Sequence, residues 1–431
     1  MKILIQGGHL VDPANGVDAQ LDLFLEGGLV ASVGEAPAGF EPDQVIDASG
    51  QIVCPGFVDL QARLREPGQE HKGSIDSETR AAARGGITTL CCPPDTSPVI
   101  DTPAVAKLVQ ERADQAARVR VAPIGALTTA LEGEQLSEMV TLAEAGCIAF
   151  SNADLPVHNT LVLRRAMEYA ASHSLLLMLQ PQDAWLAAKG CVHEGVVGLR
   201  LGLSGIPESA ETVELSRILM LVEQTGARVH FGQLSTGRAV QILRQAKRDG
   251  LPVSADVAAH QLHLTEMDLL DYSSDCHVIP PLRTQRDRDS LREGLRDGTL
   301  IAISSDHQPH DADAKLAPFA ESEPGISALE TLLPLTLRLV DEGVLSLEQA
   351  IACLTSGPAS VIDNHNGHLG VGARADVCIF DPQQHWRLDA QTMQSAGHNT
   401  PFLGWDLKGR VTHTLLNGRL SYQEPSKKAE D

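Results

Sequence analysis

The chain lacks long uninterrupted apolar runs, although apolar residues make up 43% of its 431 residues. A transmembrane helix needs about 20 consecutive apolar residues, and no stretch of the sequence approaches that length. The first apolar run, residues 3–5, is too short for the core of a secretory signal peptide. We therefore expect a cytoplasmic protein with a large buried core and no membrane partner.

Basic residues are also scarce. The chain has 34 lysines and arginines against 56 aspartates and glutamates, which gives a formal net charge of -22. Nucleic acids and anionic membranes bind basic surfaces, so the charge argues against either as the main partner. It does not indicate what the true partner is.

Paired cysteine motifs are missing as well. None of the eight cysteines forms a C-x-x-C pair, and most lie in apolar runs such as 90–92 and 377–379. Free buried thiols in a reducing compartment explain this pattern best.

Both ends of the chain read as short β-strands separated by turns. The Asn417-Gly418 pair, between two apolar runs, is a strong hairpin signal. We expect the two ends to form one discontinuous β-sandwich domain, residues 1–54 plus 366–431, because each alone has too few strands to bury its faces. The expected strands are 2–6, 21–25, 29–33, 51–54, 375–380, 411–416 and 419–422.

The middle of the chain, residues 55–365, alternates short apolar strands with amphipathic helices. Eight such strands with intervening helices predict a (β/α)₈ barrel, so the fold class is α/β. The expected strands are 57–60, 88–92, 119–124, 149–151, 175–179, 228–231, 253–257 and 301–304, with helices such as 75–84, 160–172, 209–224 and 237–249 between them.

Barrels of this kind carry their chemistry at the C-terminal ends of the strands. Several motifs there and elsewhere resemble dihydroorotases of the barrel-plus-sandwich class, in the amidohydrolase superfamily. The run 64–68 favours dihydroorotases over hydantoinases and allantoinases, and the similarity extends over essentially the whole chain. The matching blocks are 55–102, 202–209, 280–283, 305–310 and 399–405.

The resemblance implies a zinc site whose ligands are replaced here. Active relatives carry a His-x-His pair after the first strand, a carboxylate or carboxylated lysine after the fourth, histidines after the fifth and sixth, and an aspartate after the eighth. Only the aspartate is kept. The matching positions are, in that order, Gln61 and Arg63, Asn152 or Ala153, Gln180, Gln233 and Asp306.

These replacements predict that the zinc site is lost and that no cofactor is bound. Glutamine is a poor zinc ligand, and arginine stays protonated and cannot become one. Unit charges about 4 Å apart interact by about 4 kcal/mol at an effective dielectric near 20, so a dication beside Arg63 faces about twice that repulsion. We hypothesise that Arg63 fills the vacated position and pairs with Asp306.

The positions that match the family's substrate-binding residues have also changed. Arg65 matches the arginine that binds the substrate carboxylate, and His310 is kept. Two positions that usually hold asparagines beside this arginine are changed: one holds the anionic Asp95 and the other holds Ile279. A pocket with these side chains is not suited to dihydroorotate.

Three functions follow as candidates. The first is what the resemblance implies: a non-catalytic, dihydroorotase-like chain with no catalytic residues, needed for assembly or activity of aspartate carbamoyltransferase in pyrimidine biosynthesis. Its partner would be the transferase catalytic chain, with the present chain as a homodimer within a larger hetero-oligomer. The second is an active amidohydrolase with an unusual metal set, which would need a relocated site at His260, His263, Asp306 or His310. The third is a ligand-sensing regulator that uses the vestigial pocket.

Overall fold

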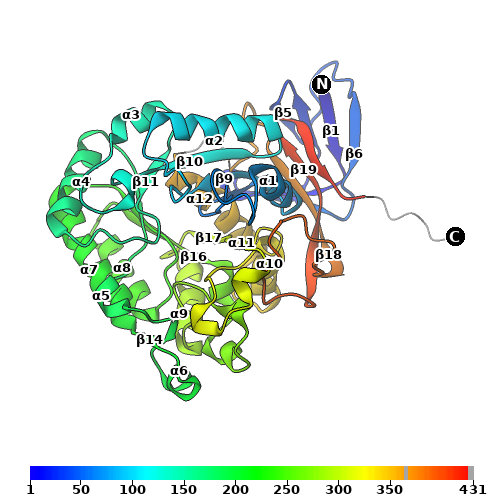
Figure 1. Ribbon diagram of the computed structural model, residues 1–431. Coiled ribbons are helices and arrows are strands. Elements are labelled where there is room, and N and C mark those ends of the chain that lie inside the picture. The colour runs from blue at the N-terminus through cyan, green and yellow to red at the C-terminus, as the bar shows by residue number, and fades with distance from the viewer. Residues whose placement is uncertain (364–366, 426–431) are drawn as a thin grey trace.

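The computed structural model describes residues 1–363 and 367–425. A ring of strands surrounded by helices forms the larger part, and β-sheets from both ends of the chain pack against one side of it (Figure 1). The predicted α/β fold with a barrel and an extra β-domain built from the termini is thus confirmed. The predicted domain boundary at residue 366 lies outside the described residues.

Eight parallel strands form the barrel, and their order in the sheet follows their order in the chain. Each predicted strand is present, with ends shifted by at most a few residues. Short apolar segments form these strands because helices cover them outside and side chains fill the barrel inside. The strands are β8 (Phe57–Asp59), β9 (Ile87–Cys92), β10 (Arg120–Ala126), β11 (Ala149–Ser151), β12 (Leu177–Leu179), β15 (Val229–Phe231), β16 (Val253–Ala258) and β17 (Ala302–Ser304).

Amphipathic helices surround the barrel. Side-chain caps fix where several of them begin; in α1, for example, Ser74 and Ser77 form a reciprocal capping box. The longer helices are α1 (Ile75–Arg84), α2 (Pro103–Ala116), α4 (Thr160–Ser172), α7 (Glu208–Thr225), α8 (Gly237–Arg248), α9 (Gln285–Arg296), α10 (Leu332–Asp341) and α11 (Leu347–Leu354); shorter ones are α3 (Met139–Glu144), α5 (Ala184–Ala187), α6 (Val196–Leu201) and α12 (Ser356–Val361).

The barrel closes just beyond the ends of its first and last strands. Ala62 and His307 form a parallel bridge, and the Arg63 N–H donates to the His307 carbonyl at 2.9 Å. The Ser305 N–H also donates to the Asp59 carboxylate at 3.0 Å. Burial raises the pKa of Asp59 to about 6, although the bonds from Ser305 oppose that shift. The closure therefore lies directly beside Arg63.

The termini form two sheets. In the larger sheet β18 (Val377–Arg387) pairs antiparallel with β7 (Ile52–Pro55), which joins the two ends of the chain as predicted. A compact apolar core between the sheets draws on both ends of the sequence. The sheets comprise β5 (Leu29–Val33), β4 (Leu23–Glu26), β1 (Lys2–Gln6) and β6 (Gln44–Asp47) in one, and β20 (Arg419–Gln423), β19 (Asp406–Leu416), β18, β7, β2 (His9–Asp12) and β3 (Val17–Gln20) in the other.

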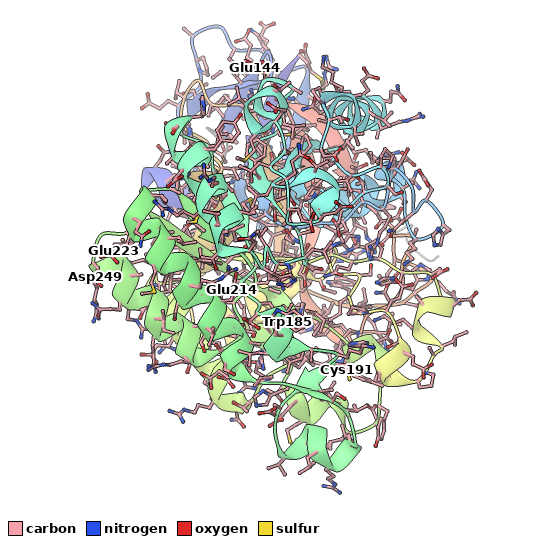
Figure 2. The ribbon with its side chains drawn as sticks, turned by 60° about the vertical axis from the view of Figure 1, so that its left-hand side comes forward. Glu144, Trp185, Cys191, Glu214, Glu223 and Asp249 are labelled. Carbon is pink, nitrogen blue, oxygen red and sulfur yellow. The ribbon has the colours of Figure 1, made fainter. Side chains whose placement is uncertain are left out.

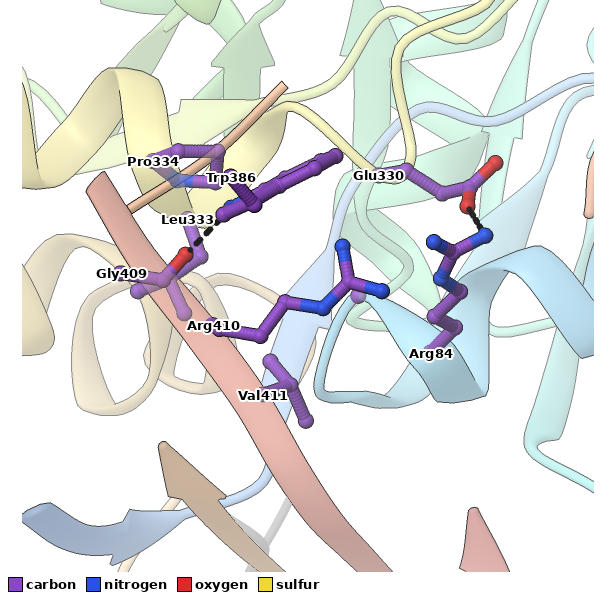
Figure 3. Close-up of a pocket in the computed structure, with 9 residues that line it drawn as sticks. Arg84, Glu330, Leu333, Pro334, Trp386, Gly409, Arg410 and Val411 are labelled. Atoms are coloured by element: carbon purple, nitrogen blue, oxygen red, sulfur yellow. Dashed lines mark hydrogen bonds and ion pairs between the residues drawn. The ribbon is translucent and has the colours of Figure 1, made fainter. Parts of the chain in front are cut away.

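The larger terminal sheet packs onto the barrel through a polar and aromatic contact (Figure 3). On the barrel side Arg84 lies 2.7 Å from the Glu330 carboxylate. On the sheet side the Trp386 indole donates to the Gly409 carbonyl at 2.9 Å, and the Arg410 guanidinium lies over the Trp386 ring at 4.4 Å. The contact therefore covers an ion pair on the barrel side and a bonded indole N–H on the sheet side.

Two further features complete the fold. Strands β13 (Val192–His193) and β14 (Gly205–Ile206) form a small parallel pair that, with α6, projects from the barrel; the sequence did not predict it. Within the described residues, no helix combines the length and apolar character needed to span a bilayer.

A buried network anchors the closing segment to α1. The His307 imidazole accepts the Ala328 N–H through Nδ1 at 3.0 Å, so its Nε2 carries the proton and donates to Glu78 at 2.9 Å. The same carboxylate accepts from the Ser395 hydroxyl at 2.6 Å and the Ala396 N–H at 3.0 Å. One buried carboxylate thus joins α1, the barrel closure and the loop before β19.

We expect Glu78→Gln to lower the free energy of unfolding by about 3 kcal/mol, because an amide cannot replace all the accepted hydrogen bonds of a buried carboxylate. Urea unfolding of the variant and the parent measures the loss. Glu144→Gln, on the exposed end of α3, is the matched control and should change stability by less than about 0.5 kcal/mol. Equal stability of the two variants would contradict the structural role of Glu78.

Candidate functional site

The Arg63 side chain occupies the mouth of the barrel, with only 4% of the residue exposed. Its Nε donates to the Asp95 carboxylate at 2.6 Å, and one terminal nitrogen donates to Asp154 at 2.6 Å. The other terminal nitrogen lies 3.8 Å from Asp306. Arg63 therefore pairs with three carboxylates, which arise from the ends of β9, β11 and β17.

This arrangement supports part of the hypothesis for Arg63 and corrects the rest. Asp306 does lie within ion-pair distance, but both charge-assisted hydrogen bonds go to Asp95 and Asp154. Sequence reasoning did not single out Asp154, and it interpreted Asp95 as an anion that repels substrate. Asp154 lies only two residues beyond Asn152, so its place at a strand end was the available signal.

The charges in this cluster shift each other's ionisation. Burial lowers the pKa of Arg63, but the Asp154, Asp95 and Asp306 carboxylates outweigh burial and raise it above the ordinary value. Burial raises the pKa of Asp306 to about 8, while Arg63 acts to lower it. The guanidinium therefore stays charged, and Asp306 takes up a proton far more readily than an exposed aspartate does.

Glutamine side chains also hold Asp306. The Gln233 amide donates to its carboxylate, and the Gln308 amide donates to the same oxygen at 2.9 Å. Gln233, at the end of β15, is one of the positions that the resemblance assigns to a lost zinc ligand. Here it serves as a donor to the one zinc-ligand position that is retained.

The Asn152 amide is fully engaged in organising its loop. Its oxygen accepts the Thr128 hydroxyl at 2.7 Å, and its nitrogen donates to the Leu131 and Leu155 carbonyls at 3.0 and 2.9 Å. Gln180 differs, because its buried nitrogen has no hydrogen-bond partner among the described residues. It lines a small cavity beside Asn152 and does not join the Arg63 cluster.

Several residues at the strand ends keep backbone conformations that side chains rarely adopt. Arg65, Ala153, Gln233 and Asp306 have φ values of 65°, 50°, 59° and 48°. Non-glycine residues in this left-handed region are uncommon and cluster at functional sites. The backbone around the candidate site therefore keeps the unusual conformations that are typical of functional sites.

Two of the residues predicted to line a vestigial substrate pocket, Arg65 and His310, contact each other and the backbone. Arg65 donates through Nε to the Pro309 carbonyl at 2.9 Å, and a terminal nitrogen lies 3.1 Å from His310 Nε2. Burial and the Arg63 charge lower the pKa of Arg65 to about 10, and burial lowers that of His310 to about 3. Ile279 packs elsewhere, against an apolar cluster around Ile206.

The histidines considered for a relocated metal site do not converge. His263 Nε2 lies 2.9 Å from the Leu335 carbonyl, and His310 Nε2 lies 2.9 Å from the Pro324 carbonyl. His260 is fully buried, and neither ring nitrogen has a partner within the described residues. No group of three or more histidine, cysteine, aspartate or glutamate side chains in the described part of the chain is arranged to hold a metal ion.

The zinc that the resemblance implies does not fit the residues present. The position after the first strand holds a permanent cation, and the amide of Asn152 is fully engaged within the fold. The three carboxylates near Arg63 are already neutralised in part by its guanidinium. A dication would have to displace or face that guanidinium, at a cost of several kcal/mol.

We expect Arg63→Ala to lower the free energy of unfolding by about 3–5 kcal/mol, because it leaves three carboxylates without their shared cation. Arg165→Ala, an exposed arginine on α4, is the matched control. Thermal unfolding measures both. Addition of about 20–50 mM guanidinium chloride should restore part of the stability of Arg63→Ala, because guanidinium can donate the hydrogen bonds that the lost side chain donated. The same concentration of sodium chloride should restore less, because sodium donates none. An Arg63→Ala variant as stable as the control would contradict this account.

Comparisons with known proteins agree with the fold and the motifs. Residues 50–238 match the family described as Dihydro-orotase-like, and residues 289–422 match the Amidohydrolase family. The chain is 51% identical over 422 residues to the "Dihydroorotase-like protein" of Pseudomonas putida, covering 98% of this chain and 99% of that protein. It is 45% identical over 423 residues to the "Dihydroorotase" of Syntrophotalea carbinolica, again covering 98% and 99%.

Solved structures give the same architecture. L-Hydantoinase from Arthrobacter aurescens superposes with a TM-score of 0.87 at 23% identity, over 97% of this chain and 95% of that one. At that identity the likeness concerns the fold alone. The sequence relatives carry the assignment further, and this chain belongs to the dihydroorotase-like family of the amidohydrolase superfamily.

Proposed function

We propose that this chain is a non-catalytic, dihydroorotase-like subunit that associates with the catalytic chain of aspartate carbamoyltransferase. The observation that carries the non-catalytic half is Arg63, whose guanidinium is buried between Asp95, Asp154 and Asp306. A fixed cation at this point takes the charge that the family assigns to a metal. The carboxylates around it then stabilise the fold instead of holding a reactive group.

The chemistry of the family supports the same reading. Opening or closing the dihydroorotate ring uses a metal-activated hydroxide and a polarised carbonyl. Arg63 cannot accept a proton or bind a metal at any ordinary pH. One carboxylate oxygen of Asp306 accepts the amides of Gln233 and Gln308 and also lies 3.8 Å from Arg63, so that oxygen is committed to contacts within the cluster.

The proposed association with the transferase is supported by the intact fold of the chain and by apolar side chains on its surface. The barrel and the terminal sheets are complete, although the candidate site is filled by its own side chains. The segment 184–201 presents apolar side chains to water: Trp185, Val196 and Leu199 are 85%, 82% and 83% exposed, and Leu186 is 40% exposed. Figure 2 marks Trp185 on α5. Several strongly exposed apolar side chains within one short segment support a surface that binds another protein.

A second candidate is an active amidohydrolase with a changed metal set. It is favoured by the names of relatives, since proteins 41–45% identical to this chain are called "Dihydroorotase". The two candidates differ in metal content, in turnover and in association, and each difference can be measured.

We expect the purified chain to contain less than about 0.1 zinc per chain and to show no saturable turnover of dihydroorotate or carbamoyl aspartate, because a cation already fills the site. Elemental analysis and a spectrophotometric assay, before and after incubation with excess zinc, provide the measurement. A zinc-dependent dihydroorotase from another source is the positive control. Stoichiometric zinc with saturable, metal-dependent turnover would favour the active amidohydrolase instead.

We expect co-expression with the transferase chain of the same organism to give a stable complex, with transferase activity that is low or absent without the present chain. Mass measurement and transferase assays report the two effects. The double substitution Trp185→Ser and Leu199→Ser should weaken association by about tenfold or more, because it removes exposed apolar area. Val371→Ser, which is 71% exposed elsewhere, is the control. Chains that fail to associate would refute the partner half and leave the non-catalytic half standing.

A further inference from the structure

A cleft of about 770 Å³ lies where the terminal sheets meet the barrel. It is lined by the turn between β4 and β5, the end of α2, the segment before β18 and the turn between β19 and β20. Because β10 begins at this cleft with Arg120, it lies at the N-terminal end of the barrel strands. It is thus separate from the Arg63 cluster, which lies at their C-terminal ends.

Backbone contacts bring arginines from separate segments together at this cleft. The Gly418 N–H donates to the Ala375 carbonyl at 2.8 Å. Arg374 precedes Ala375 and Arg419 follows Gly418, so this bond brings the backbones of the two arginines close together. A terminal nitrogen of Arg120 donates to the side chain of Asn417 at 3.2 Å, which ties the third arginine to the same turn. All three arginines line the cleft.

The cleft carries an excess of positive charge. Arg120 is partly neutralised by the buried Asp376, at 2.9 Å. Arg374 and Arg419 are exposed, and their side chains form no hydrogen bond or ion pair with residues 1–363 or 367–425. Asp114 is the one carboxylate in the lining. In a chain with a net charge of -22, two arginines that line one cleft without partners among the described residues are unusual.

We propose that this cleft binds a small phosphorylated anion. A phosphate group can accept paired hydrogen bonds from guanidinium groups and neutralises two of them at once. The volume is in the range of small-molecule sites, about 300–1,000 Å³. Asn417 and Ser421 add neutral polar groups to the lining. The ligand would contact the barrel and the terminal domain together and so strengthen their junction.

Calorimetric titration of the full chain with inorganic pyrophosphate tests the proposal. We expect one saturable site, with affinity that falls as sodium chloride is raised because screening weakens the contacts. The double variant Arg374→Gln and Arg419→Gln should bind about tenfold more weakly or worse. The control is Arg165→Gln with Arg200→Gln, two exposed arginines away from the cleft that remove the same total charge. It should bind within about twofold of the parent.

The proposal is overturned by two outcomes: absence of saturable binding by the parent chain, or equal weakening in the two double variants, which would indicate a general effect of net charge. Circular dichroism and thermal unfolding confirm that each variant is folded. If the double variant is not folded, the single variants Arg374→Gln and Arg419→Gln provide the same comparison. None of these measurements involves zinc or the transferase, so the result is independent of the function proposed above.

Discussion

The mouth of the barrel depends on one buried cation. Arg63 follows the first strand, and its guanidinium reaches carboxylates that follow the second, fourth and eighth strands: Asp95, Asp154 and Asp306. Without it, the three carboxyl groups would have no shared cation to offset their mutual repulsion. At an effective dielectric near 20 each close pair would repel by about 4 kcal/mol. The loops at this end of the barrel are therefore compatible with one another only because Arg63 is among them.

The barrel closure extends this constraint into the rest of the molecule. The backbone of Arg63 is bonded to His307, and the His307 side chain is bonded to Glu78 on α1. Glu78 in turn holds the loop that contains Ser395. A chain of direct contacts thus runs from the candidate site to the helix layer and the C-terminal segment. Residues that would serve catalysis in a metal-dependent relative here join a continuous structural network, so a change at the site should be felt in stability.

The sequence predicted the barrel well because its signals are local. Eight apolar runs, each followed by a helical period, can be recognised without knowing the packing. The terminal strands β2, β3 and β6 were missed because each is short and half polar, whereas the equally short β4 and β7 are mostly apolar. The α6 projection was missed because its exposed apolar residues break the usual pattern. The partners of Arg63 could not be read from sequence, since Asp95 and Asp154 reach it through loop conformations, and no periodicity specifies where a loop side chain points.

The distribution of these changes bears on how the site could have arisen. A site retuned for another metal would keep several donors directed at one point. Here Asn152 is committed to its loop, Gln233 donates to Asp306, and Arg63 neutralises the carboxylates that remain. Three of the replaced side chains have thus acquired contacts of their own, so restoring one histidine would leave the others engaged. The left-handed backbone at Arg65, Ala153, Gln233 and Asp306 persists all the same. Backbone strain of this kind costs about 1–3 kcal/mol per residue and survives only where the surrounding structure imposes it. The fold therefore maintains the frame of the site through packing, independently of whether the frame holds a metal.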